Sequence, residues 1–164
     1  MNKQCMVLLV ENNSGVLARV CSLFMQRGFN IDSLTVSPTE NESLSRITIM
    51  TTGDQKTFSQ IMKQTSKLVE SKMIFSVEPS FSLIREILMV KFSTFGIDVE
   101  KLKNVITSYN GRIIDTSGGC FVAEVTDTPE VIDDFLEAVE PYKLVEMCRS
   151  GAIAMERGEV SYEF

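Results

Sequence analysis

The sequence contains no histidine and no tryptophan among its 164 residues. The absence of histidine excludes Ser-His and Cys-His nucleophile pairs and His-zinc sites, and it removes the commonest general base. Any catalysis would therefore depend on carboxylates, lysine, arginine or a cofactor. The cysteines form no Cys-x-x-Cys pair, so we expect reduced, structural thiols. They are Cys5, Cys21, Cys120 and Cys148.

Basic residues and long apolar runs are also scarce. The 16 basic residues are outnumbered by 22 acidic ones, which gives a net charge of −6 and argues against binding to nucleic acid or to anionic lipid. No apolar run approaches the length of a membrane span or a signal peptide. We therefore expect a soluble, cytoplasmic protein, and its 44% hydrophobic residues can build one ordinary domain or two small ones.

Strand and helix patterns follow one another in the first half in the order βαββαβ. The apolar residues 6–10 predict a strand, and from Val16 the apolar positions take a helical spacing that ends at Gly28, a residue suited to a left-handed helix cap. Two strand patterns then flank a polar loop at residues 38–43. A helix that Asp54 would cap and a final strand complete the unit.

The second half repeats this order. "GFNIDS" at residues 28–33 matches "GRIIDT" at residues 111–116, 83 residues later, and each segment directly follows the first helix of its half. Thr128 would cap the last helix, with Pro129 at its first position. We predict an α+β protein of two ferredoxin-like βαββαβ domains, each an antiparallel sheet with helices on one face. The expected boundaries are a first domain at 1–78, a linker at 79–85 and a second domain at 86–164.

The predicted first strand of each half is apolar throughout, as "MVLLV" and "ILMV" show. A strand that is buried on one face only would alternate, so the open face of each sheet needs cover from a partner subunit, the other half or both. We therefore expect a dimer. Arg46, in "LSRITI", fits either a surface strand charge or an interface residue.

The polar turn "ENNSG" at residues 11–15 joins the first strand to the first helix. In one interpretation Asn13 or Ser14 caps the helix, and Gly15 only accommodates the tight geometry. In the other, the free N–H groups at the helix start bind a carboxylate or phosphate, and Gly15 lets the anion approach. Asn30, after the helix, is either an ordinary turn residue or a donor and acceptor for a zwitterion.

Several enzymatic and binding motifs can be compared with this turn. It has one glycine and no lysine, so it fits neither the Walker nor the dinucleotide-binding pattern. An acylphosphatase-like hydrolase shares the βαββαβ fold but needs an arginine inside the loop, whereas Arg19 lies one turn into the helix. RNA recognition by this fold needs aromatic residues on the central strands, which "VLLV" and "ITIM" lack.

Residues 11–50, "ENNSGVLARVCSLFMQRGFNIDSLTVSPTENESLSRITIM", strongly resemble the N-terminal ACT domain of the small, regulatory subunit family of acetolactate synthase (acetohydroxyacid synthase). The resemblance continues through "REILMVK", "GRIIDT" and "RSGAIAMERG". It implies a non-catalytic chain that activates a large subunit and makes it sensitive to branched-chain amino acids, chiefly valine. Thiamine diphosphate, Mg²⁺ and FAD would belong to the large subunit, so this chain would hold no cofactor or metal.

The resemblance also implies a homodimer with the amino acid at its interface. The site carried over by position consists of Asn12, Asn13, Ser14, Gly15, Val16 and Leu17 from one chain, with Asn30 and Ile31 from the other. At Asn13 the family more often has a charged or otherwise different residue. The ligand carboxylate would meet the amides near Gly15, and the short ligand predicts micromolar to millimolar affinity. An ACT-type sensor that regulates a different enzyme is the alternative.

Overall fold

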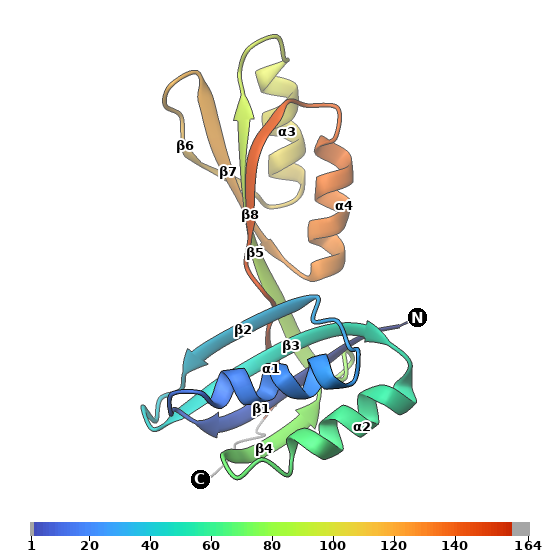
Figure 1. The fold of residues 1–164 in the computed structure, drawn as a ribbon. Coiled ribbons are helices and arrows are strands. Elements are labelled where there is room, and N and C mark those ends of the chain that lie inside the picture. Colours follow the sequence, from blue (N-terminus) through green and yellow to red (C-terminus); the bar gives the residue numbers. More distant parts are fainter. Residues whose placement is uncertain (1, 159–164) are drawn as a thin grey trace. The chain divides into compact units, whose positions relative to one another are not determined.

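The computed structural model describes residues 2–158, and the βαββαβ order occurs in it twice (Figure 1). Each copy is the main part of one compact unit. The first unit contains residues 2–83 together with residues 151–158, and the second contains Ile84–Ser150. The chain therefore passes between the units twice. The predicted domains 1–78 and 86–164 differ from these units mainly at residues 151–158, which belong to the first unit. Residues 1 and 159–164 of the predicted domains lie outside the described part.

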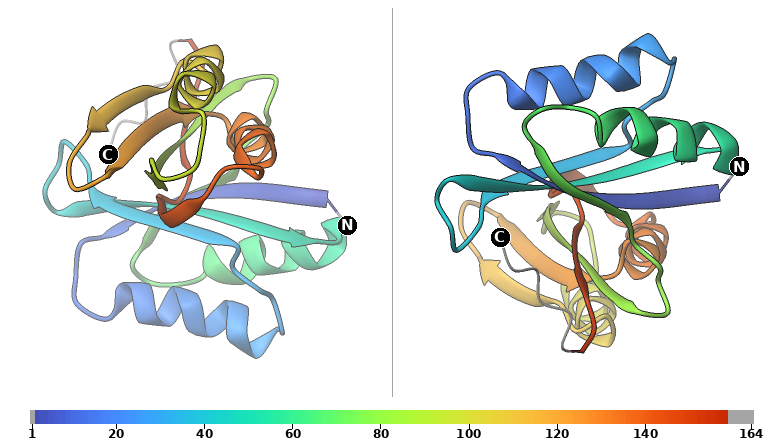
Figure 2. Two further views of the ribbon diagram at one scale, coloured as in Figure 1. Left: turned by 90° about the horizontal axis from the view of Figure 1, so that it is seen from above. Right: turned by 90° about the horizontal axis from the view of Figure 1, so that it is seen from below.

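The first unit is an antiparallel sheet with strand order β2-β3-β1-β4, and α1 and α2 cover one of its faces (Figures 1 and 2). Met6, Leu8 and Val10 of β1 form a buried cluster with apolar residues of both helices. The elements are β1 (Asn2–Glu11), α1 (Val16–Gln26), β2 (Ser33–Pro38), β3 (Leu44–Gly53), α2 (Gln55–Thr65) and β4 (Ser71–Ser76).

The ends of the helices test the predicted caps. Gly15 is the N-cap of α1, with a φ of 85° and no side-chain cap, so the expectation that Asn13 or Ser14 caps this helix is wrong. A left-handed backbone at this position suits glycine because glycine lacks a Cβ. The cap predicted for α2 is confirmed, since the Asp54 side chain accepts a hydrogen bond from the Thr57 N–H.

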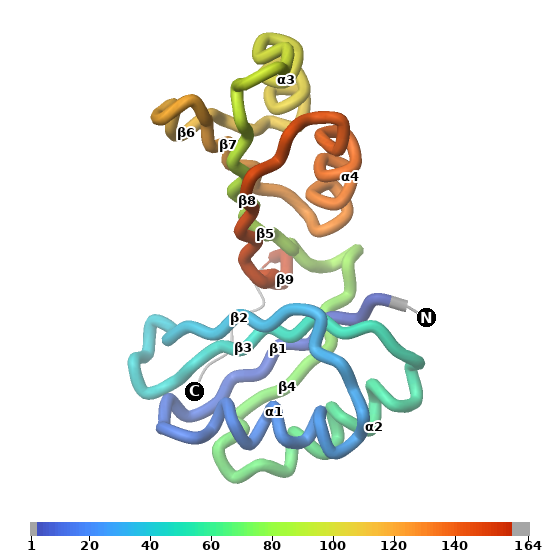
Figure 3. The backbone as a smooth tube through the Cα atoms, turned by 45° about the horizontal axis from the view of Figure 1, so that its top comes forward, coloured from blue at the N-terminus to red at the C-terminus, as the bar shows by residue number. Residues whose placement is uncertain are grey.

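The face of β1 that points away from the helices carries Cys5, Val7 and Leu9, and these three residues are also buried. Burial on both faces explains why this strand is apolar throughout instead of alternating. Within the first unit, part of the cover comes from the returning segment, residues 151–158. It contains β9 (Ile153–Glu156), drawn in Figure 3, which pairs with β5 (Ser82–Ser93).

The returning segment approaches β2 so closely that its first residue must be glycine. A Cβ on Gly151 would lie 2.3 Å from Thr35 Oγ1 and 2.9 Å from the Leu34 carbonyl oxygen. The next residue, Ala152, is buried and donates its N–H to Ser33 Oγ at 3.4 Å. The chain's own late segment thus covers part of the sheet face for which the sequence predicted a partner or the other half.

Arg46 fastens the same segment to β3. Its guanidinium donates to the Ala154 carbonyl oxygen at 2.7 Å and lies 5.7 Å from the centre of the Phe75 ring. Burial lowers the pKa of Arg46, and the Glu156 carboxylate partly offsets this effect. Burial also raises the pKa of the Cys5 thiol to about 12, so this thiol stays protonated. Arg46 is therefore an internal anchor within the first unit.

The second unit repeats the topology of the first, with the order β6-β7-β5-β8 in its sheet. This repetition confirms the internal repeat predicted from "GFNIDS" and "GRIIDT". Thr128 caps the last helix and Pro129 is its first residue, as predicted. The remaining elements are α3 (Val99–Ser108), β6 (Arg112–Asp115), β7 (Cys120–Asp127), α4 (Pro129–Val139) and β8 (Leu144–Arg149).

A partly buried ion network joins three elements of the second unit. Arg149 on β8 donates to the buried Glu86 carboxylate on β5 at 2.5 Å and to Asp133 on α4 at 2.6 Å. Burial by itself would lower the pKa of Arg149, but the hydrogen bonds to Asp133 and Glu86 raise it above its ordinary value. The network fixes the end of β8 just before the chain returns to the first unit.

Among residues 2–158, no helix is long and apolar enough to cross a membrane.

Substitution of Gly151 by valine should destabilise the protein by about 1–3 kcal/mol, because the new side chain overlaps Thr35 and Leu34. Chemical denaturation would measure the loss. Ile153→Val, two residues away and exposed, is the matched control and should change stability by less than about 0.5 kcal/mol. Equal stability of the two variants would contradict the close approach of Gly151 to β2.

Candidate functional site

Two ion pairs hold the turn between β1 and α1. One is made with Lys72 of β4, and the other with Glu70, the residue before β4. Glu11 at the end of β1 binds Lys72 at 2.5 Å through one carboxylate oxygen and the Asn13 amide at 3.0 Å through the other. Arg19, in the second turn of α1, binds Glu70 at 2.5 Å. These groups are partly exposed, so the pairs add little stability. Each pair places one cation and one carboxylate beside the turn.

Asn12 connects the turn to the loop between β2 and β3. Its amide donates to the Glu42 carbonyl oxygen at 2.9 Å, and its side-chain oxygen accepts from the Ser45 hydroxyl at 3.0 Å. The main-chain N–H of Asn12 also donates to the Ser43 carbonyl oxygen at 2.8 Å. In this structure Asn12 therefore shapes the turn through contacts within its own chain.

The start of α1 presents N–H groups that the helix cannot satisfy. The Val16 N–H makes a long, 3.4 Å bond to the Asn13 carbonyl oxygen, and Leu17 at the second helical position has no intrahelical acceptor. A Cβ on Gly15 would meet only the Arg19 guanidinium, at 3.8 Å. The space beside Gly15 is therefore open on this side, and the guanidinium next to it also pairs with Glu70. Free N–H groups at a helix start favour an anion.

A hollow of about 280 Å³ lies next to the turn. This volume is near the lower end of the range for small-molecule sites. Its polar groups, the Lys72 ammonium and the Asn12 and Asn13 amides, each make a hydrogen bond within the chain. Its lining residues are Glu11, Asn12, Asn13, Ser43, Leu44 and Lys72.

Asn30 and Ile31 lie at the other end of α1, between this helix and β2 (Figure 1). The Asn30 side-chain amide donates to the Asp32 carboxylate at 3.2 Å, and the main-chain carbonyl oxygen of Asn30 accepts from the Thr51 hydroxyl. Because α1 has 11 residues, its two ends are roughly 16 Å apart. One chain therefore brings together residues 12–17 but keeps them apart from Asn30 and Ile31.

The sequence interpretation did not include Glu11, Ser43 or Lys72 in the site. Lys72 reaches the turn because β4 pairs with β1 and the register shifts between Leu9 and Val10. A register shift of this kind has no local sequence signal, and Lys72 is 61 residues from Glu11 along the chain. Within residues 2–158, no group of three or more Cys, Asp or Glu side chains is placed to hold a metal ion.

Comparisons with known proteins agree with the architecture of both units. Residues 6–71 match the family model of the AHAS small subunit-like ACT domain, and residues 85–158 match that of the small subunit of acetolactate synthase. The acetolactate synthase isozyme 3 small subunit of Escherichia coli is 38% identical over 96% of this chain and 97% of its own length. The Salmonella typhimurium protein of the same name is 39% identical over equal shares.

A solved structure gives the same result. The crystal structure of the acetolactate synthase small subunit from Thermotoga maritima superposes with a TM-score of 0.87 at 34% identity, and the match covers 98% of this chain and all of that chain. The first unit thus contains an ACT domain. The chain belongs to the family of acetolactate synthase small subunits, which are regulatory and not catalytic.

Removal of the Asn12 side chain, in the variant Asn12→Ala, should destabilise the protein by about 1–2 kcal/mol, because the buried Ser45 hydroxyl then loses its acceptor. Asn13→Ala is the control, since within residues 2–158 the Asn13 amide bonds to the partly exposed Glu11 alone, and it should cost less than about 0.5 kcal/mol. Urea denaturation measures both. A larger loss for Asn13→Ala would show that the turn is held differently.

Proposed function

We propose that this chain binds and activates the catalytic large subunit of acetolactate synthase and makes it subject to feedback inhibition by valine. Family membership supports the role in that enzyme. One structural observation carries the proposal of an effector site. The turn at residues 12–17 and the pair Asn30 and Ile31 lie at opposite ends of an 11-residue helix, so a site that uses both groups needs two chains.

In the proposed homodimer, the valine carboxylate binds the N–H groups at the start of α1, near Gly15. The Arg19 guanidinium lies beside this position, and in the single chain it pairs with Glu70. Asn30 of the second chain orients the ammonium group. Leu17, which is partly exposed, and Ile31 of the second chain contact the branched side chain, whereas Val16 is buried and supports them from the core.

Because the effector contacts two chains, its binding favours the dimer arrangement in which both halves of the site meet. Inhibition then follows from a difference in valine affinity between that arrangement and the one that activates the large subunit. By the same linkage, the active complex should bind valine more weakly than the free small subunit does.

The chemistry of acetolactate formation lies in the large subunit under this proposal. Thiamine diphosphate, Mg²⁺ and FAD bind there, and this chain contributes regulation alone. The four cysteines are free thiols, and Cys148 is exposed, which suits the reducing cytoplasm proposed for the complex.

A mixing experiment tests the proposal directly. The purified chain is added to the cognate large subunit, and acetolactate formation is measured with and without valine. We expect activity to rise on mixing and to fall again when valine is added. Unchanged activity of the large subunit would favour the alternative of an ACT-type sensor for another enzyme. Release of phosphate from an acyl phosphate by this chain alone would instead indicate an acylphosphatase-like hydrolase.

Gly15→Asp should remove valine inhibition while activation of the large subunit is retained. The new carboxylate lies where the ligand carboxylate should bind, next to Arg19, and like charges repel. Gly15→Asn is the matched control, because asparagine has the same shape as aspartate, carries no charge and tolerates the positive φ of this position.

Calorimetry should show a loss of valine affinity of about tenfold or more for Gly15→Asp relative to Gly15→Asn. Normal valine binding by Gly15→Asp would place the site elsewhere.

A further inference from the structure

The connection between α1 and β2 is fixed to β3 by its main chain. The carbonyl oxygen of Asn30 accepts a hydrogen bond from the hydroxyl of the fully buried Thr51 at 2.7 Å. The Asp32 N–H donates to the Met50 carbonyl oxygen at 2.9 Å. Both bonds are made to a strand inside the sheet, so the main chain holds Asn30 and Asp32 in place.

The Asp32 carboxylate orients the Asn30 side chain. Asn30 Nδ2 donates to Asp32 Oδ1 at 3.2 Å, and the Thr52 hydroxyl donates to Asp32 Oδ2 at 2.7 Å. An ionised carboxylate only accepts hydrogen bonds, so the part of the Asn30 amide that faces Asp32 must be the NH2 group. The amide oxygen of Asn30 is therefore directed away from Asp32.

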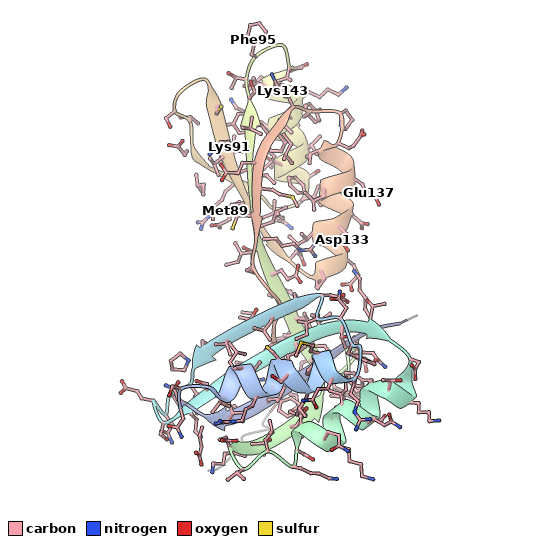
Figure 4. The ribbon with its side chains drawn as sticks, in the orientation of Figure 1. Met89, Lys91, Phe95, Asp133, Glu137 and Lys143 are labelled. Carbon is pink, nitrogen blue, oxygen red and sulfur yellow. The ribbon has the colours of Figure 1, made fainter. Side chains whose placement is uncertain are left out.

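The two contacts leave the charge of Asp32 in place, because an amide and a hydroxyl are both neutral. Asp133 of the second unit, labelled in Figure 4, shows the more common arrangement, in which a carboxylate pairs with a cation, here Arg149 at 2.6 Å. Asp32 thus adds a negative charge behind the Asn30 amide. A charge in this position favours a positive group on a ligand that meets the amide oxygen.

The second unit shows what the same aspartate does where the asparagine is missing. In the repeated segments "GFNIDS" and "GRIIDT", Asp115 takes the place of Asp32, and Ile113 takes the place of Asn30. The Asp115 carboxylate accepts from the Ser117 hydroxyl at 2.7 Å and from the Ser117 N–H at 3.3 Å. Asp115 therefore stabilises its own turn, whereas Asp32 holds an amide.

We propose that Asp32 is a specificity-determining residue of the effector site, which makes the site select an amino acid over the keto acid with the same carbon skeleton. This inference rests on the proposed function, in which Asn30 of the second chain orients the valine ammonium. The two ligands share the carboxylate and the branched side chain. An ammonium donates to the Asn30 amide oxygen, but a keto oxygen only accepts, so two acceptors would face each other.

Rotation of the Asn30 amide would remove this selection, because its NH2 group would then donate to the keto oxygen. Asp32 opposes the rotation, since the rotated amide would place its own oxygen against the carboxylate and leave both acceptors without a donor. Asp32 acts through Asn30 and is a positioning residue.

Asp32→Asn tests the inference. Asparagine keeps the shape of aspartate but both donates and accepts, so the Asn30 amide becomes free to rotate. Calorimetry on the full chain measures the affinities for valine and for the keto acid with the carbon skeleton of valine. We expect weaker binding of valine and tighter binding of the keto acid, so that the ratio of the two affinities falls at least about tenfold.

Asp115→Asn is the matched control, because it makes the same substitution at the equivalent position of the repeat, and it should change the ratio by less than about twofold. If Asp32 only stabilised the fold, Asp32→Asn would affect both ligands alike. An unchanged ratio would therefore overturn the inference and leave the effector site standing. Absence of valine binding by the unmodified chain would instead contradict the proposed function, and the inference with it.

Discussion

The burial of β1 on both faces is the constraint from which most of the first unit follows. One face packs on the helices through Met6 and Leu8, and the other is closed in part by the returning segment, where Arg46 binds the Ala154 carbonyl oxygen. A strand held from both sides fixes the direction in which the chain leaves at Glu11. This strand therefore positions the turn that follows it and the start of α1 with its unsatisfied N–H groups. A binding site on a polar turn is thus as rigid as the apolar strand before it.

Much of this architecture is readable from local patterns. The apolar periods, the caps at Asp54 and Thr128 and the repeated "GFNIDS" and "GRIIDT" segments each depend on neighbouring residues, so they predicted the two βαββαβ units correctly. The α1 cap was mispredicted because asparagine and serine are better caps by propensity, whereas the left-handed geometry at this position selected Gly15.

The features that the sequence did not predict join residues far apart in the chain. Lys72 enters the turn through a register shift, and Arg46 and Gly151 meet partners on strands more than 100 residues away. Neither contact can be predicted from neighbouring residues, because the small and apolar residues of "SGAIAM" at 150–155 are compatible with several packings. The position of the proposed effector turn came from the family resemblance alone. The length of α1 shows that one chain keeps this turn apart from Asn30 and Ile31.

The returning segment has a consequence for biosynthesis. Val7 and Leu9 leave the ribosome early, but Ala152 and Ala154, which close part of the same unit, are made almost 150 residues later. At ordinary translation speeds this delay is on the order of ten seconds. During that time the nascent ACT unit has an apolar sheet face without its final cover. An apolar surface exposed in this way is prone to aggregation until the late segment docks.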